Sequence, residues 1–469
     1  MVVFFSSKSL ARSARSPLAT TAPIYSKKNL GFWNRTTMIW VALAAWIGLA
    51  LFLPTYSFGS YKANLSAVPF TQNWAQYSPF VSLAEYHVPR NCIVTQINLL
   101  ERHGARYPTS GSAAGIISAI DKLTALDEFT NKRMQFLANY TYDLGVADLV
   151  PFGAAQAYES GETFFQRYSY LVDQDHIPFV RASGSDRVIK SATNWTAGFS
   201  AASYHAYNPP LSVILSEDLN DTLDDNLCEN AGDSDDQTNA WLAIYAPTIT
   251  ARINDGAPGA NVSNDDTYSL LSMCPFDSVA KEKRSPFCDM FEAADFEGFE
   301  YSGDLDKYYG TGYGQELGPV QGVGYVNELL ARLTASPVRD STQTNHTLDS
   351  NPETFPLNRT FYADFSHDNQ MIAIYSAMGL FPQSADLDPT SPDPNRNWLA
   401  SRLVSFSANM VTEKLECSGE DYVRVLVNDE VQPLAFCGSG DGLCSLDAFV
   451  ESQSYARNNG NGDWEKCFS

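Results

Sequence analysis

Two arginines flank a histidine within five residues of the segment 101–109, which reads ERHGARYPT. Arg102 and Arg106 offer bidentate donors that match a phosphate group and do not lose their protons. The positive charges around His103 disfavour its own protonation, so the imidazole stays available as a nucleophile in mild acid. These residue types predict a phosphate site with a nucleophilic histidine, and the alternative is a solvated basic turn.

The residues before this segment must position it. Residues 92–100 are rich in β-branched and aliphatic side chains and follow Pro89, which predicts a buried strand. Ligands of open α/β sheets bind outside the carboxyl ends of strands, and Gly104 lets backbone amides approach an anion. Apolar residues then recur with a helical period over 112–129. The predicted order is therefore strand, anion-binding turn and helix.

Two later segments repeat this order. Residues 177–181 predict a short strand that ends at Arg181, and apolar residues follow it at helical spacing. Residues 360–365 predict an extended strand, followed by His367, Asp368 and a further helix. The N-terminal amides of that helix favour an anion.

The segment RHGARYPT at 102–109 resembles the signature of the histidine acid phosphatases, specifically the fungal phytase branch. Four later segments resemble the same branch in the same order. They are RASGSDR at 181–187, KYYG at 307–310, GPVQGVGY at 318–325 and YADFSHDN at 362–369. The similarity extends from about residue 74 to the C-terminus.

The resemblance implies a phosphohistidine on His103 and a proton donor in Asp368. The residues it implies as phosphate ligands are Arg102, Arg106, Arg181 and His367. It also implies a substrate-pocket role for Lys307, for which the alternative is a plain surface lysine. Arg187 is expected to be a solvated or salt-bridged helix residue.

The N-terminal region predicts targeting. Residues 1–37 contain six basic and no acidic residues and precede sixteen apolar residues at 38–53, and residues 54–73 form a linker. Sixteen helical residues span roughly 24 Å, short of a hydrocarbon core of about 30 Å. The pattern fits a cleaved secretory signal or an uncleaved signal-anchor. We expect the rest of the chain to be secreted or held outside by a single membrane anchor.

Cysteines and sequons agree with export. All eight cysteines follow the apolar segment, which predicts four disulfides, and spacing alone leaves 105 pairings open. The resemblance implies the pairs Cys92–Cys417, Cys228–Cys467, Cys274–Cys288 and Cys437–Cys444. Candidate glycosylation sites are Asn64, Asn139, Asn194, Asn220, Asn261, Asn345 and Asn358. No cysteines have CxxC spacing, so no metal is expected, and the chemistry requires no cofactor.

Charge limits the partners. The whole chain has a formal net charge of −23, and removing the basic leader leaves about −29. Such a surface argues against nucleic acid or anionic lipid as a partner. The resemblance implies a small phosphomonoester as the partner, and we expect a monomer. The negative surface also repels a polyanionic substrate at neutral pH. This favours either activity at acid pH or a pocket that is locally positive.

The predicted fold is α/β, with a large domain built from both chain ends and a smaller, mostly α-helical inserted domain, as in the histidine phosphatases. We assign residues 74–160 and 335–469 to the α/β catalytic domain and residues 161–334 to the insertion. The alternating segments 403–417 and 422–434 predict a hairpin that turns at Asn428 and Asp429.

The leading function is an exported acid phosphomonoesterase that hydrolyses myo-inositol hexakisphosphate (phytate) to lower inositol phosphates and orthophosphate. Residues 110–116 read SGSAAGI, whereas some fungal phytases carry lysines there, which weakens the prediction of tight phytate binding. The first alternative is a broad-specificity acid phosphatase. The second is a glycosylated binding protein without catalysis.

Overall fold

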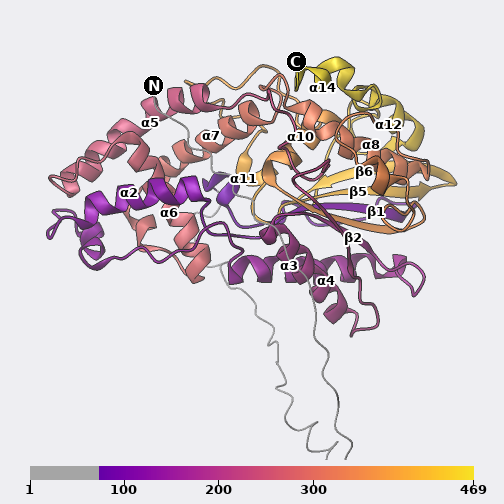
Figure 1. Cartoon of the computed structure of the whole chain (residues 1–469), viewed down its shortest axis with the longest axis horizontal. Helices are drawn as coiled ribbons and strands as arrows, with labels where there is room; N and C mark the ends of the chain where they lie inside the picture. Colours follow the sequence, from indigo (N-terminus) through magenta and orange to yellow (C-terminus); the bar gives the residue numbers. More distant parts are fainter. Residues whose placement is uncertain (1–72) are drawn as a thin grey trace, which may run out of the picture. The chain divides into compact units, whose positions relative to one another are not determined.

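A mixed sheet of eight strands is the central element of the computed structural model, which describes residues 73–469 (Figure 1). The strand order is β3-β2-β4-β1-β5-β6-β7, and β8 pairs with β6. The bounds are β1 (Cys92–Arg102), β2 (Phe179–Ser183), β3 (Leu211–Leu215), β4 (Phe361–Ser366), β5 (Asn409–Cys417), β6 (Glu420–Val427), β7 (Glu430–Val431) and β8 (Cys444–Ser445).

The four strands β1, β4, β2 and β3 run parallel, so their carboxyl ends meet at one edge of the sheet. Arg102 at the end of β1 is in register with Ser366 at the end of β4. His103 and His367 therefore leave the sheet from adjacent strands. This confirms the strands expected at 92–100, 177–181 and 360–365 and explains why distant motifs converge.

Helices cover both faces of the sheet (Figure 1). One face packs on α3 (Pro151–Tyr168) and α4 (Asp186–Ala202), where Trp195 and Phe199 meet Leu99 and Phe365 in one core. The other face packs on α8 (Val323–Thr334) and α10 (Asp368–Met378) around Leu100 and Tyr362. α12 (Leu446–Ser452) and α13 (Ser454–Arg457) complete that layer. Burying both faces is what allows the parallel strands to be continuously apolar.

A third core is mainly helical. It is formed by α2 (Ser110–Thr124), α5 (Asp235–Gly256), α6 (Asn264–Lys281) and α7 (Ala293–Gly310), which bury residues such as Ile116, Ile253, Leu270 and Phe299. These four helices lie together at the side of the molecule away from β5 and β6 (Figure 1).

The helical core and the expected insertion 161–334 have different bounds. β2, α4 and β3 fall inside that range yet belong to the sheet and its covering layer, whereas α2 falls outside it yet packs with the helical core. The reason is the crossover rule: parallel strands need helices between them in the chain, so α3 and α4 must stay on the sheet.

The C-terminal strands form the expected hairpin, but with an earlier turn. β5 and β6 are joined at Ser418 and Gly419, and both residues have positive φ. The predicted turn at Asn428 and Asp429 joins β6 to the short β7 instead.

The shorter helical elements are η3 (Ala75–Tyr77), η4 (Lys132–Asn139), η5 (Ser169–Leu171), η6 (Pro286–Met290), η7 (Pro319–Gly322), α9 (His346–Asp349), α11 (Ala400–Leu403), η8 (Asn459–Gly462) and α14 (Asp463–Lys466).

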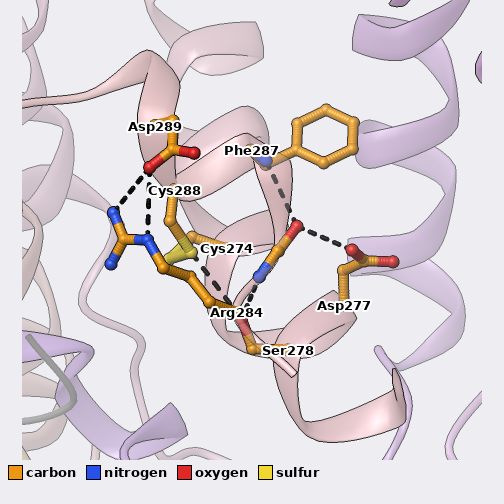
Figure 2. Close-up of a disulfide and its surroundings, with 8 residues drawn as sticks. Cys274, Asp277, Ser278, Arg284, Phe287, Cys288 and Asp289 are labelled. Carbon is orange, nitrogen blue, oxygen red and sulfur yellow. Dashed lines mark hydrogen bonds and ion pairs between the residues drawn. A yellow bond between two sulfur atoms is a disulfide. The ribbon is translucent and has the colours of Figure 1, made fainter. Parts of the chain in front are cut away.

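Four disulfides join all eight cysteines, in the pairing that the resemblance implied. Cys274–Cys288 ties α6 to η6 within the helical core (Figure 2). Polar contacts reinforce that link, because Asp277 accepts a hydrogen bond from the Ser285 hydroxyl at 2.6 Å and Arg284 pairs with Asp289 at 2.9 Å (Figure 2).

The apolar segment 38–53, and with it the expected signal or signal-anchor, lies outside the described residues. Within residues 73–469, no helix combines the length and apolar character needed to cross a membrane.

Candidate active site

A cavity of about 250 Å³ opens at the edge where the parallel strands end. Residues from the two predicted motifs, from α4 and from α7 share its lining, which includes Arg106, Arg187, Lys307, His367, Asp368 and Asn369. The ring of His103 lies 5.7 Å, between centroids, from the ring of His367. The topology thus brings together segments that are more than 200 residues apart.

His103 is almost fully buried directly after β1. Its Nδ1 lies 2.8 Å from the carbonyl oxygen of Gly104, and since a carbonyl only accepts, Nδ1 carries the proton. The lone pair is therefore on Nε2. Burial, and next the charges of Arg102 and Arg106, lower the pKa of His103 well below its usual value. The imidazole is consequently neutral and nucleophilic in mild acid.

The turn that carries His103 is pressed against α3. A Cβ on Gly104 would lie 2.2 Å from the carbonyl oxygen of Gly153, and a Cβ on Gly153 would lie 2.1 Å from the carbonyl oxygen of Ala105. The Ala105 amide donates to the side chain of Gln156 at 3.0 Å. Close backbone contact requires glycine at both positions and fixes the turn in place.

Arg102 is fully buried and anchored by the backbone. Its Nη1 donates to the carbonyl oxygens of Val404, at 2.5 Å, and of Gln76. Its Nε and Nη2 have no hydrogen-bond partner, although Nη2 lies 3.3 Å from Asp368. Arg106 lines the cavity and its Nε is likewise without a hydrogen-bond partner. Both guanidinium groups therefore retain donors for a phosphoryl group.

The prediction that Arg181 binds phosphate is wrong. Arg181 is buried in the interior of β2, where its Nη2 pairs with Glu328 at 2.6 Å and its Nε pairs with Asp364 at 2.7 Å. Asp364 is its register neighbour on β4, so strand pairing itself determines this ion pair. Two carboxylates already occupy the guanidinium donors.

Arg187 takes the place expected for Arg181. It lies in the first turn of α4, lines the cavity, and its Nη2 is 3.2 Å from Nδ1 of His367. Sequence reasoning missed it because an arginine on a helix surface usually faces solvent. The available signal was its position at the start of the helix that follows a strand, since Asp368 likewise begins the helix after β4.

Asp368 begins α10, and its Oδ2 lies 3.0 Å from Nζ of Lys307. Burial works to raise the pKa of Asp368, but the charges of Arg102, Lys307 and Arg106 outweigh it and hold the pKa well below the usual value. Asp368 is therefore ionised in the free protein. Lys307 is 5% exposed, so it is not a plain surface lysine, and it also contacts Asp306 at 3.0 Å.

Carboxylates that the sequence did not single out surround His367. Glu217 lies 3.1 Å and Asp224 lies 3.7 Å from its Nε2, and Asp225 also lines the cavity. In the described part of the chain, Glu217, Asp224 and His367 form the one group of possible metal ligands that converge, within 4.8 Å. A hydrogen bond from Nε2 of His367 accounts for the approach of Glu217 without a cation.

The geometry is that of one nucleophilic imidazole, three guanidinium groups and an acidic side chain around a small cavity. The sequence-family model of the histidine phosphatase superfamily (branch 2) matches residues 93–428 of this chain. The chain belongs to this superfamily. The matched region contains all of the active-site residues described above.

Relatives of this phosphatase support a narrower grouping. Phytase A of Aspergillus fumigatus is 42% identical over 422 residues, which cover 84% of this chain and 90% of that protein. Phytase A of Arthroderma benhamiae is 41% identical and covers 85% of this chain and 92% of its own length. The prediction of a fungal phytase-like phosphoric monoester hydrolase is confirmed at this level.

Solved structures confirm the predicted fold class of the phosphatase. The crystal structure of a phytase from D. castellii superposes with a TM-score of 0.69 at 24% identity, over 85% of this chain and 90% of that chain. A multiple inositol polyphosphate phosphatase from Bifidobacterium longum, in complex with inositol hexasulfate, superposes with a TM-score of 0.59 at 15% identity. That comparison covers 80% of this chain and 96% of the bacterial chain.

Proposed function

We propose that this phosphatase hydrolyses phytate in acid through a phosphohistidine at His103. The observation that carries the proposal is the unprotonated Nε2 of a buried histidine beside three guanidinium groups. Phosphoryl transfer requires a nucleophile in line with the leaving oxygen and positive charge around the equatorial oxygens. The cluster supplies both.

In the first step, Nε2 of His103 attacks phosphorus and the ester P–O bond breaks. Arg102, Arg106 and Arg187 hold the three equatorial oxygens, where negative charge accumulates. Asp368 gives its proton to the leaving alkoxide. In the second step, the carboxylate of Asp368 takes a proton from water, the water oxygen attacks the phosphohistidine, and the P–N bond breaks to release orthophosphate.

Asp368 must gain a proton before it acts. It is ionised in the free site because Arg102 and Lys307 stabilise its carboxylate. A bound phosphoryl dianion competes for both cations and adds negative charge beside the carboxyl group, so the affinity of Asp368 for a proton rises. Acid solution supplies that proton, which is why we assign an acid optimum.

Two observations bear on the substrate. The relatives of about 40% identity are named Phytase A, which supports phytate. On the other hand, Asp306 and Asp225 line the phosphate cavity, and Lys307 is the one lysine among its lining residues. This favours the alternative of a broad-specificity acid phosphatase more than the sequence alone did.

The test is phosphate release by the purified protein, with specificity constants for phytate and for an aryl phosphate between about pH 3 and 7. A strong preference for phytate supports the proposal. Comparable constants indicate a broad acid phosphatase, and no release from either substrate indicates the binding protein without catalysis.

We also propose that the catalytic part is exported and glycosylated. Four disulfides support an oxidising compartment, and the sequon residues Asn139, Asn220, Asn261 and Asn358 are exposed. Cell fractionation and a mass shift after treatment with an endoglycosidase test this. Activity in the medium supports a cleaved signal, and activity that sediments with membranes supports an anchor.

A further inference from the structure

Glu217 lies outside every sequence motif but belongs to the same sheet edge. It follows β3 by two residues, where that strand ends beside β2. Its carboxylate accepts hydrogen bonds from the Ser185 amide at 2.7 Å, the Ser185 hydroxyl at 2.9 Å and the Ser183 hydroxyl at 2.9 Å. Three donors from the neighbouring strand end therefore hold the Glu217 side chain in one orientation.

The fourth partner of Glu217 is His367, and the contacts of the ring determine its tautomer. Nδ1 lies 3.2 Å from Nη2 of Arg187, and a guanidinium group only donates, so Nδ1 carries the lone pair. The proton is consequently on Nε2, which donates to Oε1 of Glu217 at 3.1 Å. Glu217 thus fixes both the orientation of the ring and the position of its proton.

We infer that Glu217 is a positioning residue, which keeps Nδ1 of His367 directed to the phosphoryl group and balances the charge of the ring when Nδ1 is protonated. The inference rests on the proposed function and on the role of phosphate ligand that the family resemblance implies for His367. On substrate binding Arg187 turns to the phosphoryl oxygens, Nδ1 takes a proton from acid solvent, and the Nδ1–H group donates to one of those oxygens. The carboxylate of Glu217 stabilises the resulting imidazolium.

Two carboxylates approach His367 in the described part of the chain, and Glu217 is the one that combines close contact with negative charge. Asp224 is the nearest alternative at 3.7 Å, and burial raises its pKa to about 7, so it is mostly neutral in acid. The hydrogen bond from His367, and then those from Ser185 and Ser183, hold the pKa of Glu217 far below its usual value. Other charged or titratable groups that face the ring are Arg187, His103, Asp221 and Asp225.

The first test is Glu217→Gln, which keeps an oxygen for the Nε2 proton but removes the negative charge. We expect kcat/KM for an aryl phosphate to fall about 10- to 100-fold, the size of one hydrogen bond to a charged group. We also expect the alkaline limb of the kcat/KM profile to move to lower pH by about one unit, because the imidazolium loses its counter-charge. Glu217→Asp keeps the charge, so its alkaline limb should stay in place even though kcat falls.

Asp221→Asn is the matched control. Asp221 shares the Ser183 hydroxyl with Glu217, at 2.8 Å, and accepts the Leu223 amide, but forms no hydrogen bond or ion pair with His367, and burial raises its pKa to about 6, so it is mostly neutral in acid. We expect this variant to retain the wild-type kcat/KM and pH profile. Thermal unfolding of both variants separates local loss of stability from loss of function.

A double-mutant cycle with His367→Ala isolates the mechanism, since Glu217→Gln should cause no further loss once the ring is absent. Additive losses, or a Glu217→Gln variant with wild-type rates and an unchanged pH profile, overturn the inference. A wild-type protein that releases no phosphate overturns the proposed function instead. In that case the binding of inorganic phosphate at acid pH, measured by calorimetry, still tests the role of Glu217. Glu217→Gln should weaken phosphate binding by the same 10- to 100-fold, and an affinity equal to that of the wild type refutes the role.

Discussion

Arg187 and Arg181 are six positions apart in the sequence, but substitution by methionine should affect different properties of the protein. Arg187→Met should lower activity, whereas Arg181→Met should lower stability. Arg187 lines the cavity and contacts His367, whereas Arg181 is buried with Glu328 and Asp364. Arg187→Met removes one of three donors to the equatorial oxygens. Loss of one such donor typically lowers kcat about 10²- to 10³-fold, with little change in stability for an exposed-cavity residue.

Arg181→Met should instead lower the free energy of unfolding of the protein. The side chains of Arg181 and Glu328 are each 2% exposed, so solvent does not screen their pairing. Asp364 keeps a second cation, Arg332 at 2.5 Å, whereas Glu328 keeps the uncharged Thr222 hydroxyl at 2.9 Å and the neighbouring Asp349. Removing one partner of a buried pair costs about 3–5 kcal/mol. With an unfolding entropy of about 2.1 cal/mol/K per residue over roughly 400 residues, Tm should fall by about 4–6 °C.

Calorimetry gives the Tm of each variant. Steady-state kinetics, under conditions where each variant is folded, give its kcat/KM. We expect Arg181→Met to retain kcat/KM within about threefold, since it touches no reacting group. The reasoning is refuted if Arg181→Met loses activity about 100-fold at an unchanged Tm, or if Arg187→Met keeps wild-type kinetics.

Further predictions concern the reaction itself. His103→Ala should abolish turnover and the acid-labile phosphate label that rapid quenching traps on the wild-type protein; a label of equal intensity on the variant would place the nucleophile elsewhere. Asp368→Asn should slow esters with poor leaving groups most, and a uniform loss across a leaving-group series would contradict its role as acid. The acid limb of kcat/KM should lie well below pH 6.5, because burial and then Arg102 and Arg106 lower the pKa of His103. Arg106→Met removes one of these charges, so the limb should rise by about one pH unit, and a fall would show that the sign is wrong. Asp306→Asn frees Lys307 from its 3.0 Å contact and should lower KM for phytate severalfold but not KM for an aryl phosphate, as measured in parallel.

The parts of the site that follow a strand in the sequence could be predicted from it. His103 and His367 each come directly after an apolar run, and parallel pairing of β1 with β4 then places them side by side. The cysteine pairs were implied by family resemblance and not by spacing. Local sequence pattern could not show which of two nearby arginines, Arg181 or Arg187, lines the active-site cavity.

Arg181 was misassigned because its partners are distant. Asp364 is 183 positions away and Glu328 is 147 positions away, so no local pattern shows that both carboxylates close on this guanidinium. Glu217 was missed for a related reason. It lies in a stretch of acidic and small residues that looks like a solvated loop, and only the parallel pairing of β3 with β2 turns it toward the active site.

The position of β1 in the sheet also sets the order in which the polypeptide can mature. β1 carries the nucleophile near the start of the catalytic region, yet both of its neighbours, β4 and β5, are encoded late in the chain. Cys92 and its partner Cys417 are separated by 325 positions. At about 5–20 residues per second, roughly 16–65 s of translation pass before the first strand meets its last partner. An apolar strand that waits this long for its full set of neighbours is a target for chaperones and for wrong pairing, so the yield of active protein should depend more on the chaperones present during synthesis than on the stability of the finished sheet.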